Sequence, residues 1–549
     1  MTRILVIGGY GGFGGRLCRR LSDAGYDLLV GGRDERKARS FCAALPRAVP
    51  VAIDREGEIA SILQEHRPDL VIDAAGPFQA SGYDVPLACI AARIPYLDLA
   101  DATGFVAGIA ALDEAARRSG VALVSGASSL PALSTAVAER LAEGLDAVRR
   151  VDIALSAANR AMGGASVLRA ALSYAGRPVR LRRGGRWTYG FGWQDLRRID
   201  FELPEGRALR GRLVALADVP DLVLLPDRLP GQPTVVFRAG TELRFHMLAL
   251  SAAAAVVRCG WLRSLLPAAR PIVWAYGITR ALGGVRSAMR VALAGRIGNA
   301  AVERIWTLVA ERGQGLELPT LAATLLAEKM LAGRIAPGAR SAAGLVPLEA
   351  FEKAFEGIDV RWELTERTLP PPLYARLMGD DFVRLPTAVR NLHDLCADGG
   401  AEGDGMVERG RGLAAGLLGF LMGMPPPGKT PIHVAFTECG GAETWTRDFG
   451  GHLFASELSG RDGLLVERFG PVRFAFQVPG GPDGLEMKLH RWSFLGLPMP
   501  AWLGPRISAR EYEEGGRFRF DVRVSMPLVG QIVRYSGSLD LIHGGDDVI

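Results

Sequence analysis

Glycines are the residues of this chain whose spacing points most directly to chemistry. Residues 8–15 read Gly-Gly-Tyr-Gly-Gly-Phe-Gly-Gly, and Gly9, Gly11 and Gly14 within them have the spacing Gly-x-Gly-x-x-Gly. An apolar run, residues 4–7, precedes these glycines, and a stretch with helical spacing, residues 16–21, follows them. In a strand–turn–helix unit these three glycines allow a tight turn, close approach of a pyrophosphate, and close packing of helix on strand.

The pattern therefore predicts a dinucleotide-binding turn. We expect Gly12 and Phe13 to open the helix, so that its free N–H groups and positive dipole end face the phosphates. The alternative is a glycine-rich turn in an α/β domain that binds no nucleotide.

Basic residues follow the second expected strand, residues 27–32. In an NAD-selective site an acidic residue near this point holds the ribose 2′-hydroxyl, but here the position falls to Arg33, with Arg36 and Lys37 close behind. A guanidinium suits a 2′-phosphate, so we predict NADP(H) as the cofactor. The alternative is that these residues form only a solvated helix start.

Side chains at later strand ends are the candidates for chemistry on a substrate. Hydride transfer needs a positioned nicotinamide and a group that balances charge on the acceptor. Asp98 and Asp101 leave an expected strand beside that position, and Tyr96 and Ser128 are further catalytic candidates. The alternative for each aspartate is a helix cap.

Two more segments are expected to contact the cofactor. Asp54 follows the third expected strand and is expected to flank the adenine. The loop Ala75-Gly76-Pro77-Phe78 follows the fourth expected strand and is expected beside the nicotinamide.

Alternation of strands and helices positions all these groups. Apolar runs separated by helical stretches recur over about 130 residues, which predicts a doubly wound parallel sheet of the Rossmann type. After the first, the expected strands are residues 27–32, 49–53, 70–75, 95–101 and 121–127. Ligands of such sheets bind at the carboxyl ends of the strands.

At this point the sequence resembles the saccharopine-dehydrogenase-like reductases. The glycine turn, Ala75-Gly76-Pro77-Phe78, Tyr96-Leu97-Asp98 and the turn at 126–131 carry the resemblance, which extends to about residue 360. It implies an NADP-dependent oxidoreductase. The family includes imine reductases, polyamine-pathway reductases and enoyl reductases acting on lipid chains, and we find no polar cluster here suited to a saccharopine-like dicarboxylate.

A second domain, α+β and spanning residues 130–365, is expected after the Rossmann domain of residues 1–129. It includes strands at 148–155 and 234–238, and an arginine-rich turn at 180–186 that is either a solvated hairpin or a contact for an anionic surface. Residues 246–310 combine apolar runs, tryptophans and arginines without an apolar stretch long enough to span a bilayer. They fit helices in a membrane interface, or equally helices that cover a pocket or build a dimer face.

A third domain, residues 370–549, follows the prolines at 370–372. Helical residues 373–394, a glycine-rich linker at 399–405 and an apolar helix at 413–422 are expected before an antiparallel β-rich region with glycine turns about every ten residues. Through the stretches at 373–377, 407–410, 447–451, 467–470 and 508–512, this part resembles a bacterial domain of unknown function. A curved sheet enclosing an apolar ligand and a structural or interaction module are both open for it.

Composition limits the remaining classes. The 549 residues carry a net charge of +6, but no basic run with interleaved aromatics argues for nucleic acid. The six cysteines have no paired spacing and are interpreted as buried thiols, and the seven histidines stand apart, so no metal site is predicted. The chain begins directly with a strand, so we expect no signal peptide and a cytoplasmic protein, with contact with the inner membrane and a homodimer as further expectations.

We therefore interpret the chain as an NADPH-dependent oxidoreductase that transfers a hydride to a lipophilic enoyl or carbonyl acceptor. An imine or amino-acid dehydrogenase is the first alternative. A non-catalytic, nucleotide-binding, membrane-associated scaffold is the second.

Overall fold

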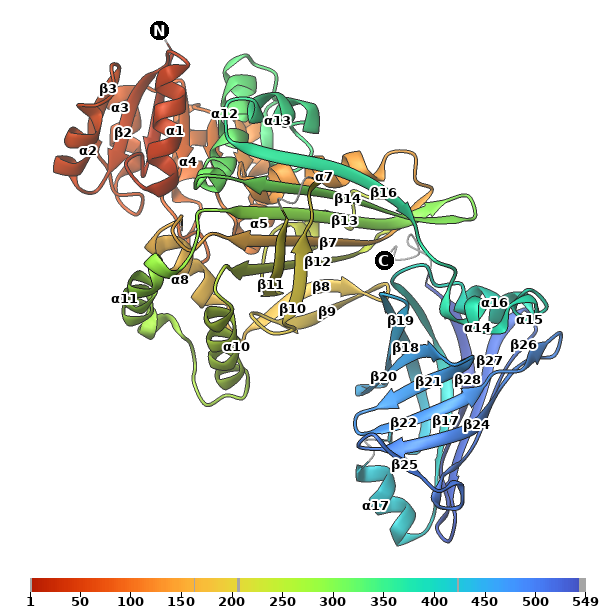
Figure 1. Cartoon of the computed structure of the whole chain (residues 1–549). Helices are drawn as coiled ribbons and strands as arrows, with labels where there is room; N and C mark the ends of the chain where they lie inside the picture. The colour runs from red at the N-terminus through yellow and green to blue at the C-terminus, as the bar shows by residue number, and fades with distance from the viewer. Residues whose placement is uncertain (1, 162, 205–207, 422–423, 543–549) are drawn as a thin grey trace.

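The computed structural model describes residues 2–161, 163–204, 208–421 and 424–542. Three units follow one another along the chain: a parallel sheet with helices on both faces, a mixed sheet with helices, and a closed antiparallel barrel. In Figure 1 the first unit, in red and orange, lies at the upper left, the second occupies the centre, and the barrel, in blue, lies at the lower right.

The first unit is a seven-stranded, all-parallel sheet with the order β15-β6-β5-β4-β1-β2-β3. Its strands are β1 (Arg3–Ile7), β2 (Asp27–Gly32), β3 (Ala48–Ala52), β4 (Leu70–Asp73), β5 (Tyr96–Asp98), β6 (Ala122–Ser125) and β15 (Gly338–Ser341). Its helices are α1 (Gly12–Asp23), α2 (Glu35–Cys42), α3 (Ile59–His66), α4 (Asp84–Ala92), α5 (Thr103–Gly108) and α6 (Asp113–Ser119). The predicted doubly wound sheet is confirmed.

Apolar residues of the central strands alternate between two cores. Ile4 and Val6 pack with α1 on one face, whereas Leu5 and Ile7 pack with α3 and α4 on the other. Both faces of β1 are therefore buried, which explains why this strand is a continuous apolar run.

The edge strand β15 comes from far along the chain. Gly338–Ser341 pairs in parallel with β6, although the sequence assigns this segment to the second domain. The helix before it, α12 (Leu318–Leu331), packs against α1, and Glu317 at its start forms ion pairs with Arg16 and Arg20 at 3.0 and 3.1 Å. The segment around residues 317–341 thus returns to complete the first unit.

The second unit is a seven-stranded sheet with the order β10-β11-β12-β7-β13-β14-β16, in which only β12 and β7 run parallel. Its strands are β7 (Ala147–Ala157), β10 (Arg197–Phe201), β11 (Leu209–Leu216), β12 (Thr234–Thr241), β13 (Ser287–Ile297), β14 (Ala300–Ala310) and β16 (Val360–Thr368). Its helices are α7 (Ser134–Ala142), α8 (Ala165–Ser173), α9 (Asp221–Leu224), α10 (Arg244–Arg258), α11 (Ala269–Thr279) and α13 (Leu348–Phe355). The predicted α+β class is confirmed.

The arginine-rich turn joins β8 (Pro178–Arg183) and β9 (Arg186–Phe191) in a hairpin whose tip packs against the barrel. The Gly184 carbonyl lies 2.8 Å from His433 Nε2, and Arg186 forms an ion pair with Glu402. The turn is therefore a hairpin, as one interpretation expected, but its tip meets protein rather than solvent or an anionic surface.

The third unit is an antiparallel barrel of ten strands, closed by pairing of β22 with β24. The strands are β17 (Gly399–Arg409), β18 (Gly428–Cys439), β19 (Ala442–Phe449), β20 (His452–Arg461), β21 (Leu464–Phe469), β22 (Val472–Gln477), β24 (Gly484–Phe494), β26 (Arg506–Glu514), β27 (Arg517–Met526) and β28 (Gly530–Leu541). The predicted β-rich class is confirmed.

The predicted linker at 399–405 is wrong, because these residues begin β17 between β18 and β28. Its glycines are needed because neighbouring atoms pack too closely for a side chain, not because the segment must be flexible. A Cβ added at Gly400 would lie 2.0 Å from the Gly184 carbonyl, and one at Gly405 would lie 2.3 Å from the Ile432 side chain.

Helices lie at both ends of the barrel. α14 (Leu373–Met378), α15 (Asp380–Val383) and α16 (Thr387–His393) cover its upper end in Figure 1, and α17 (Leu413–Leu421) lies at the lower end. The predicted helices at 373–394 and 413–422 are thus found, in the first case as three short helices; residue 422 lies outside the described residues.

Two further findings concern the cysteines and the apolar character of the helices. All six cysteines are free, but Cys259 and Cys439 are exposed, so the prediction that the cysteines are buried thiols is wrong for these two. Within the described ranges, no helix has both the length and the apolar character that crossing a membrane requires.

Candidate functional site

The glycine turn between β1 and α1 has the close packing that its spacing predicts. Gly8 adopts a left-handed backbone with φ +75°, and the Gly11 N–H donates to its carbonyl at 2.8 Å. A Cβ added at Gly14 would lie 2.2 Å from the same carbonyl oxygen. Any side chain at position 14 would therefore push α1 away from the turn.

The start of α1 leaves room for an anion. Gly11 is the extended residue before the helix, and the first turn contains no acidic side chain. The Gly12 and Phe13 N–H groups have no acceptor within the helix. A Cβ added at Gly11 would meet only the Gly8 oxygen, at 3.0 Å, so the backbone there is open to a pyrophosphate.

The backbone that carries the basic groups after β2 packs against Tyr10. A Cβ at Gly32 would meet the Tyr10 ring at 2.3 Å, and the Tyr10 hydroxyl accepts a hydrogen bond from the Asp34 N–H at 2.9 Å. Arg33 and Arg36 are exposed and form no ion pair within the described residues. Lys37 instead lies 3.4 Å from Asp34, whose side chain also caps α2 by accepting from the Lys37 N–H.

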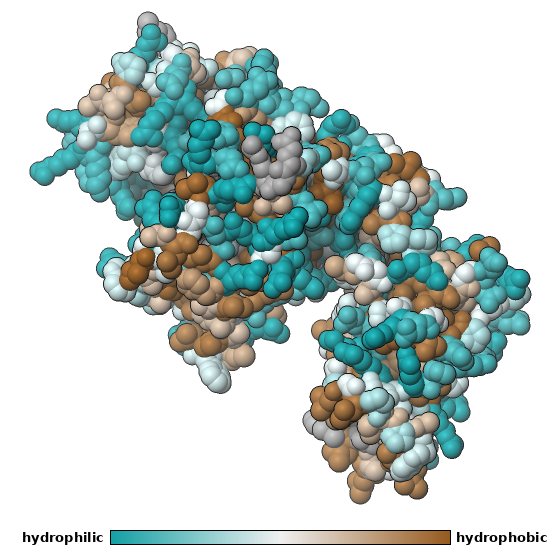
Figure 2. Space-filling view, viewed as in Figure 1, coloured by the Kyte–Doolittle hydropathy of each residue, from teal (hydrophilic) through white to brown (hydrophobic). Residues whose placement is uncertain are grey.

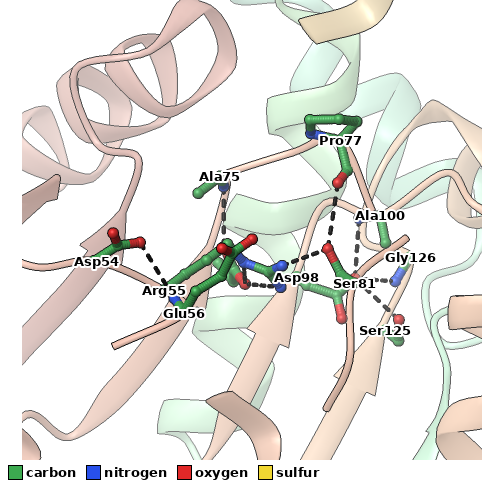
Figure 3. Close-up of polar contacts among 11 residues, drawn as sticks. Asp54, Arg55, Glu56, Ala75, Pro77, Ser81, Asp98, Ala100, Ser125 and Gly126 are labelled. Atoms are coloured by element: carbon green, nitrogen blue, oxygen red, sulfur yellow. Dashed lines mark hydrogen bonds and ion pairs between the residues drawn. The ribbon is translucent and has the colours of Figure 1, made fainter. Parts of the chain in front are cut away.

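An ion pair at the ends of β3 and β4 holds the loop 75–78 (Figure 3). Arg55 donates to the buried Asp73 carboxylate at 2.9 and 3.1 Å and to the Ser81 hydroxyl. The Asp73 Oδ1 atom accepts from the Ala75 N–H at 2.9 Å, and the Arg55 guanidinium lies over the Phe78 ring, 5.0 Å from its centre. This pair therefore orients both ends of the expected nicotinamide loop.

Asp54 precedes this arginine but is exposed, with its carboxylate accepting only the Glu56 N–H at 3.2 Å (Figure 3). Sequence reasoning selected Asp54 and missed Arg55 and Asp73. The available signal was an acidic residue at the end of an otherwise apolar strand, because a buried carboxylate needs a basic partner.

Asp98 and Tyr96 have no exposed surface. The Asp98 Oδ1 atom accepts from the Ala100 N–H, the Ser125 hydroxyl and the Gly126 N–H at 2.8 to 3.0 Å (Figure 3). Burial raises the pKa of Asp98 to about 7 against these three hydrogen bonds. Both side chains thus lie beneath the strand ends, and Asp98 joins the loops after β5 and β6.

Asp101 lies at the interface between the first and second units. It accepts from Gln79 Nε2 at 3.2 Å, while Asp218, after β11, accepts from the Thr103 hydroxyl at 2.7 Å. Burial raises the pKa of both carboxyls, and the negative charge of Asp218 raises that of Asp101 further.

Tyr174 completes this group, which we call the acidic cluster: Asp101, Asp218 and Tyr174. Burial raises the Tyr174 pKa well above its usual range, and the charges of Asp101 and Asp218 add to the shift. The ring stacks on Trp193 at 5.6 Å. Sequence reasoning found Asp101 but missed the other two, because they lie on segments of the second unit far away along the chain.

Ser128 is half-buried near the start of the turn after β6, with its N–H donating to the Gly126 carbonyl at 2.8 Å. Among the described residues, no three histidine, cysteine, aspartate or glutamate side chains gather as a metal site would require.

Comparison with known families identifies two parts of the chain. Residues 4–124 match the saccharopine dehydrogenase NADP-binding domain, and residues 385–539 match a domain of unknown function, DUF4166. A search of curated proteins finds no match.

Solved structures resemble the chain at low identity. Saccharopine dehydrogenase (L-Glu forming) from Saccharomyces cerevisiae, in its apo form, is 10% identical over 66% of this chain and 100% of its own, with a TM-score of 0.46. An amine dehydrogenase from Mycobacterium smegmatis is 12% identical over 62% of this chain and 95% of its own, with a TM-score of 0.35.

The family match and the glycine turn agree on the cofactor. Residues 4–124 therefore form an NADP-binding domain like that of saccharopine dehydrogenase, which supports an NAD(P)-dependent oxidoreductase.

Proposed function

We propose that the protein uses NADPH to reduce a lipophilic enoyl or carbonyl acceptor. The observation that carries the proposal is the acidic cluster, which joins the strand ends of the NADP-binding domain to the second unit. Beside it, the second unit carries an exposed apolar surface on α10 and α11.

The cofactor would be held by groups already described. The backbone of Gly9, Gly11, Gly12, Phe13 and Gly14 would bind the pyrophosphate at the start of α1. Arg33 and Arg36, which have no competing ion pair within the described residues, would bind the 2′-phosphate, and Lys37 would add positive charge.

Further residues would enclose the rest of the cofactor. Asp54 would flank the adenine side, and the loop of Ala75, Gly76, Pro77 and Phe78, held by Asp73 and Arg55, would border the nicotinamide. When bound, NADPH supplies the hydride.

The acidic cluster would supply the proton that balances this hydride. A carboxyl with a raised pKa keeps its proton at a pH where an ordinary aspartate has lost it, and so can act as a general acid. We assign this role to Asp101, with Asp218 sustaining its raised pKa. Ser128 remains a candidate for a hydrogen bond to the acceptor, whereas Asp98 positions the loops after β5 and β6 and Tyr96 is buried in the core.

The lipophilic acceptor is proposed from what borders the cluster. Two residues after Tyr174, a Cβ at Gly176 would meet the Ala254 carbonyl at 2.2 Å and Val257 at 2.9 Å, so α10 packs directly on this turn. Large apolar side chains of α10, α11 and their connection are exposed: Phe245, Leu248, Trp261, Leu262, Leu266, Trp274 and Ile278. Figure 2 shows an apolar surface over this region.

The charge of the same region favours an anionic bilayer as its partner. Between Glu242 and Glu303 the sequence has no acidic residue but contains eight arginines. Trp261 is 82% exposed and Trp274 70%, which suits the interfacial zone of a membrane. We therefore propose a cytoplasmic protein that contacts the inner membrane through α10 and α11.

Turnover tests the function directly. Purified full chain would be mixed with NADPH and long-chain enoyl esters, aldehydes or ketones in phosphatidylglycerol vesicles, and NADPH absorbance followed. We expect oxidation of NADPH with at least one acceptor class. Asp101→Asn should lower kcat by about 100-fold without weakening NADPH binding, whereas the exposed control Asp23→Asn should not.

The pH profile sharpens this test. Because the Asp101 pKa is raised, kcat should stay on its plateau above the ordinary aspartate range and fall as the pH rises through the shifted value. An Asp101→Asn variant with full activity, or no turnover of any acceptor, would contradict the proposal.

Membrane contact has its own test. Flotation with phosphatidylglycerol vesicles should recover the wild type, and Trp261→Ser with Trp274→Ser should lose most of that binding. The control Trp362→Ser, on β16 and 38% exposed, should keep it. If the protein instead remains unbound and sediments as a dimer that the same double variant dissociates, a second copy of the chain covers this surface.

An imine or amino-acid dehydrogenase is the second candidate. The paired carboxylates Asp101 and Asp218 would favour the cationic nitrogen of an iminium over a neutral carbonyl. Oxidation of NADPH by cyclic or amino-acid-derived imines, with none by lipophilic carbonyls, would support it. Tight NADPH binding with no acceptor turned over at all would support a nucleotide-binding scaffold.

A further inference from the structure

The barrel contains a cavity of about 550 Å³, and all its lining residues lie in the third unit, outside the candidate oxidoreductase site. It extends from Tyr374 on α14, at the covered end, to Gly470 and Pro505, in loops at the opposite end. Its volume is within the range of about 300–1,000 Å³ typical of small-molecule sites.

The walls of the cavity are apolar because side chains along each strand point alternately into the barrel and out of it. Inward residues such as Val434, Phe474 and Phe520 line the cavity. Neighbouring outward residues on the same strands, such as Arg519 and Asp521, lie on the polar exterior. Native cores rarely leave such a volume empty, since each unfilled space forfeits packing energy. The cavity therefore has the form of a binding site for an apolar molecule.

The covered end of the cavity is polar. Arg447 donates to the Ser456 hydroxyl at 2.8 Å and lies 3.5 Å from Glu467. Glu511 lies 2.5 Å from His393, and the centre of the His393 ring lies 3.8 Å from that of the Tyr374 ring. Each lining carboxylate thus has its own basic partner.

Tyr374 differs from these paired groups. Its side chain is fully buried, its hydroxyl has no hydrogen-bond partner among the described residues, and it lines the cavity. A buried hydroxyl without a partner is costly, by about 1–3 kcal/mol. Burial also raises its pKa well above the usual range, so the group stays a neutral donor.

The pairing argues against a charged ligand head. A carboxylate placed here would compete with Glu467 for Arg447, and an ammonium would compete with Arg447 or His393 for a glutamate. Separating a buried ion pair is strongly unfavourable. A neutral head that accepts a hydrogen bond from Tyr374 disturbs neither pair.

The opposite end of the barrel presents apolar residues to the outside. Helix α17 and the strand ends and connections there carry exposed Leu413, Leu417, Leu453, Leu495, Leu497 and Trp502. In Figure 1 this end, with α17, points away from the first two units. An apolar rim lets a lipophilic molecule pass from a membrane or micelle into the cavity without crossing a polar surface.

We propose that the barrel binds one long-chain lipophilic molecule with a neutral hydrogen-bonding head, such as a fatty alcohol or ketone. Its chain fills the apolar cavity, and its head accepts a hydrogen bond from the Tyr374 hydroxyl. The site is formed by the barrel and its covering helix α14 and does not depend on NADPH.

A competition experiment with the full chain tests this proposal. The neutral fluorophore N-phenyl-1-naphthylamine would be titrated into the protein without NADPH, and then displaced by hexadecanol, palmitate or hexadecylamine, each below its solubility limit or critical micelle concentration. We expect saturable binding of one fluorophore per chain. Hexadecanol should displace it at concentrations at least about tenfold lower than either charged analogue, about 1.4 kcal/mol.

Variants locate the site. Tyr374→Phe should reduce the advantage of hexadecanol about tenfold while leaving fluorophore binding unchanged, and Tyr512→Phe, on the outer face of β26, should change neither. Ala509→Trp, which fills the cavity, should abolish fluorophore binding; if that variant does not fold, the Tyr374→Phe result decides. Equal displacement by all three analogues, or a Tyr374→Phe variant that keeps the full preference for the alcohol, would overturn the proposal.

Discussion

The dinucleotide turn and the barrel cavity are two sites built in opposite ways. The turn is formed by consecutive residues, Gly8 to Gly14, so one short stretch of sequence is enough to predict it. The barrel cavity takes two or more side chains from nine of the ten barrel strands, together with Tyr374 from a covering helix. A site made by one strand–turn–helix unit can be read locally, whereas a site made by closure of a sheet exists only once the sheet has closed.

The two sites also differ in what limits substitution. Around the turn, backbone atoms approach each other so closely that a single methyl group is excluded. Around the cavity, side chains leave space, and substitutions change its shape and polarity more than its framework. Variants that affect one site should therefore leave the other intact.

Gly14→Ala should separate the two sites most strongly, by weakening NADPH binding without changing binding in the barrel. The new Cβ would lie 2.2 Å from the Gly8 carbonyl, so α1 must move and its first N–H groups lose their position. We expect NADPH affinity to fall by about 1,000-fold, about 4 kcal/mol, while fluorophore binding in the barrel is unchanged. Gly277→Ala, where an added Cβ meets nothing within 4 Å, is the control. Loss of both binding activities would mean that the two sites are not independent.

Asp98→Ala should be next in size, acting on stability. It removes the acceptor of three hydrogen bonds, which should lower the free energy of unfolding by about 3 kcal/mol, whereas Asp98→Asn keeps an acceptor and should cost less. Chemical denaturation followed by circular dichroism measures both.

The pH dependence gives Asp98 a second test. Its folded pKa of about 7 exceeds its ordinary value of 3.8, so the folded state binds the proton more tightly. This contribution is full below about pH 4 and is lost as the pH rises to about 7, so the wild type should lose stability relative to Asp98→Asn over that interval. A constant difference between the two proteins across this range would refute the assignment.

Arg186→Ala should have the smallest effect. The ion pair between Arg186 and Glu402 joins the β8–β9 hairpin to the barrel, but both side chains are about half exposed. Such pairs contribute less than about 1 kcal/mol. Thermal unfolding should therefore change by only a few degrees, and both NADPH and fluorophore binding should persist. A large loss of either would mean that the hairpin couples the two sites.

Local patterns predicted the elements of the first unit well. The runs at residues 4–7 and 27–32 are buried on both faces of a parallel sheet, which gives a continuous apolar stretch that has little ambiguity. The edge strand β15 was missed because its four residues become a strand only by pairing with β6, far away along the chain.

The candidate site was likewise predictable where it depends on local sequence and not where it depends on contacts between units. The glycine turn and Asp101 follow from local sequence, but the partners of Asp101 do not, since Tyr174 and Asp218 belong to another unit. The glycines of β17 were misread for a related reason: glycine at a close approach and glycine in a linker have the same sequence, and only the neighbours at Gly400 and Gly405 distinguish them.

The central claim is that the chain binds NADPH through Arg33. Purified wild type, Arg33→Ala and the control Arg39→Ala, an exposed arginine of α2 already paired with Glu35, would be titrated with NADPH and NADH while nicotinamide fluorescence is followed. We predict that the wild type and Arg39→Ala bind NADPH at least about tenfold more tightly than NADH, and that Arg33→Ala loses this preference by weakening only NADPH binding. Equal binding of the two nucleotides by the wild type, or no binding of either, would contradict the account.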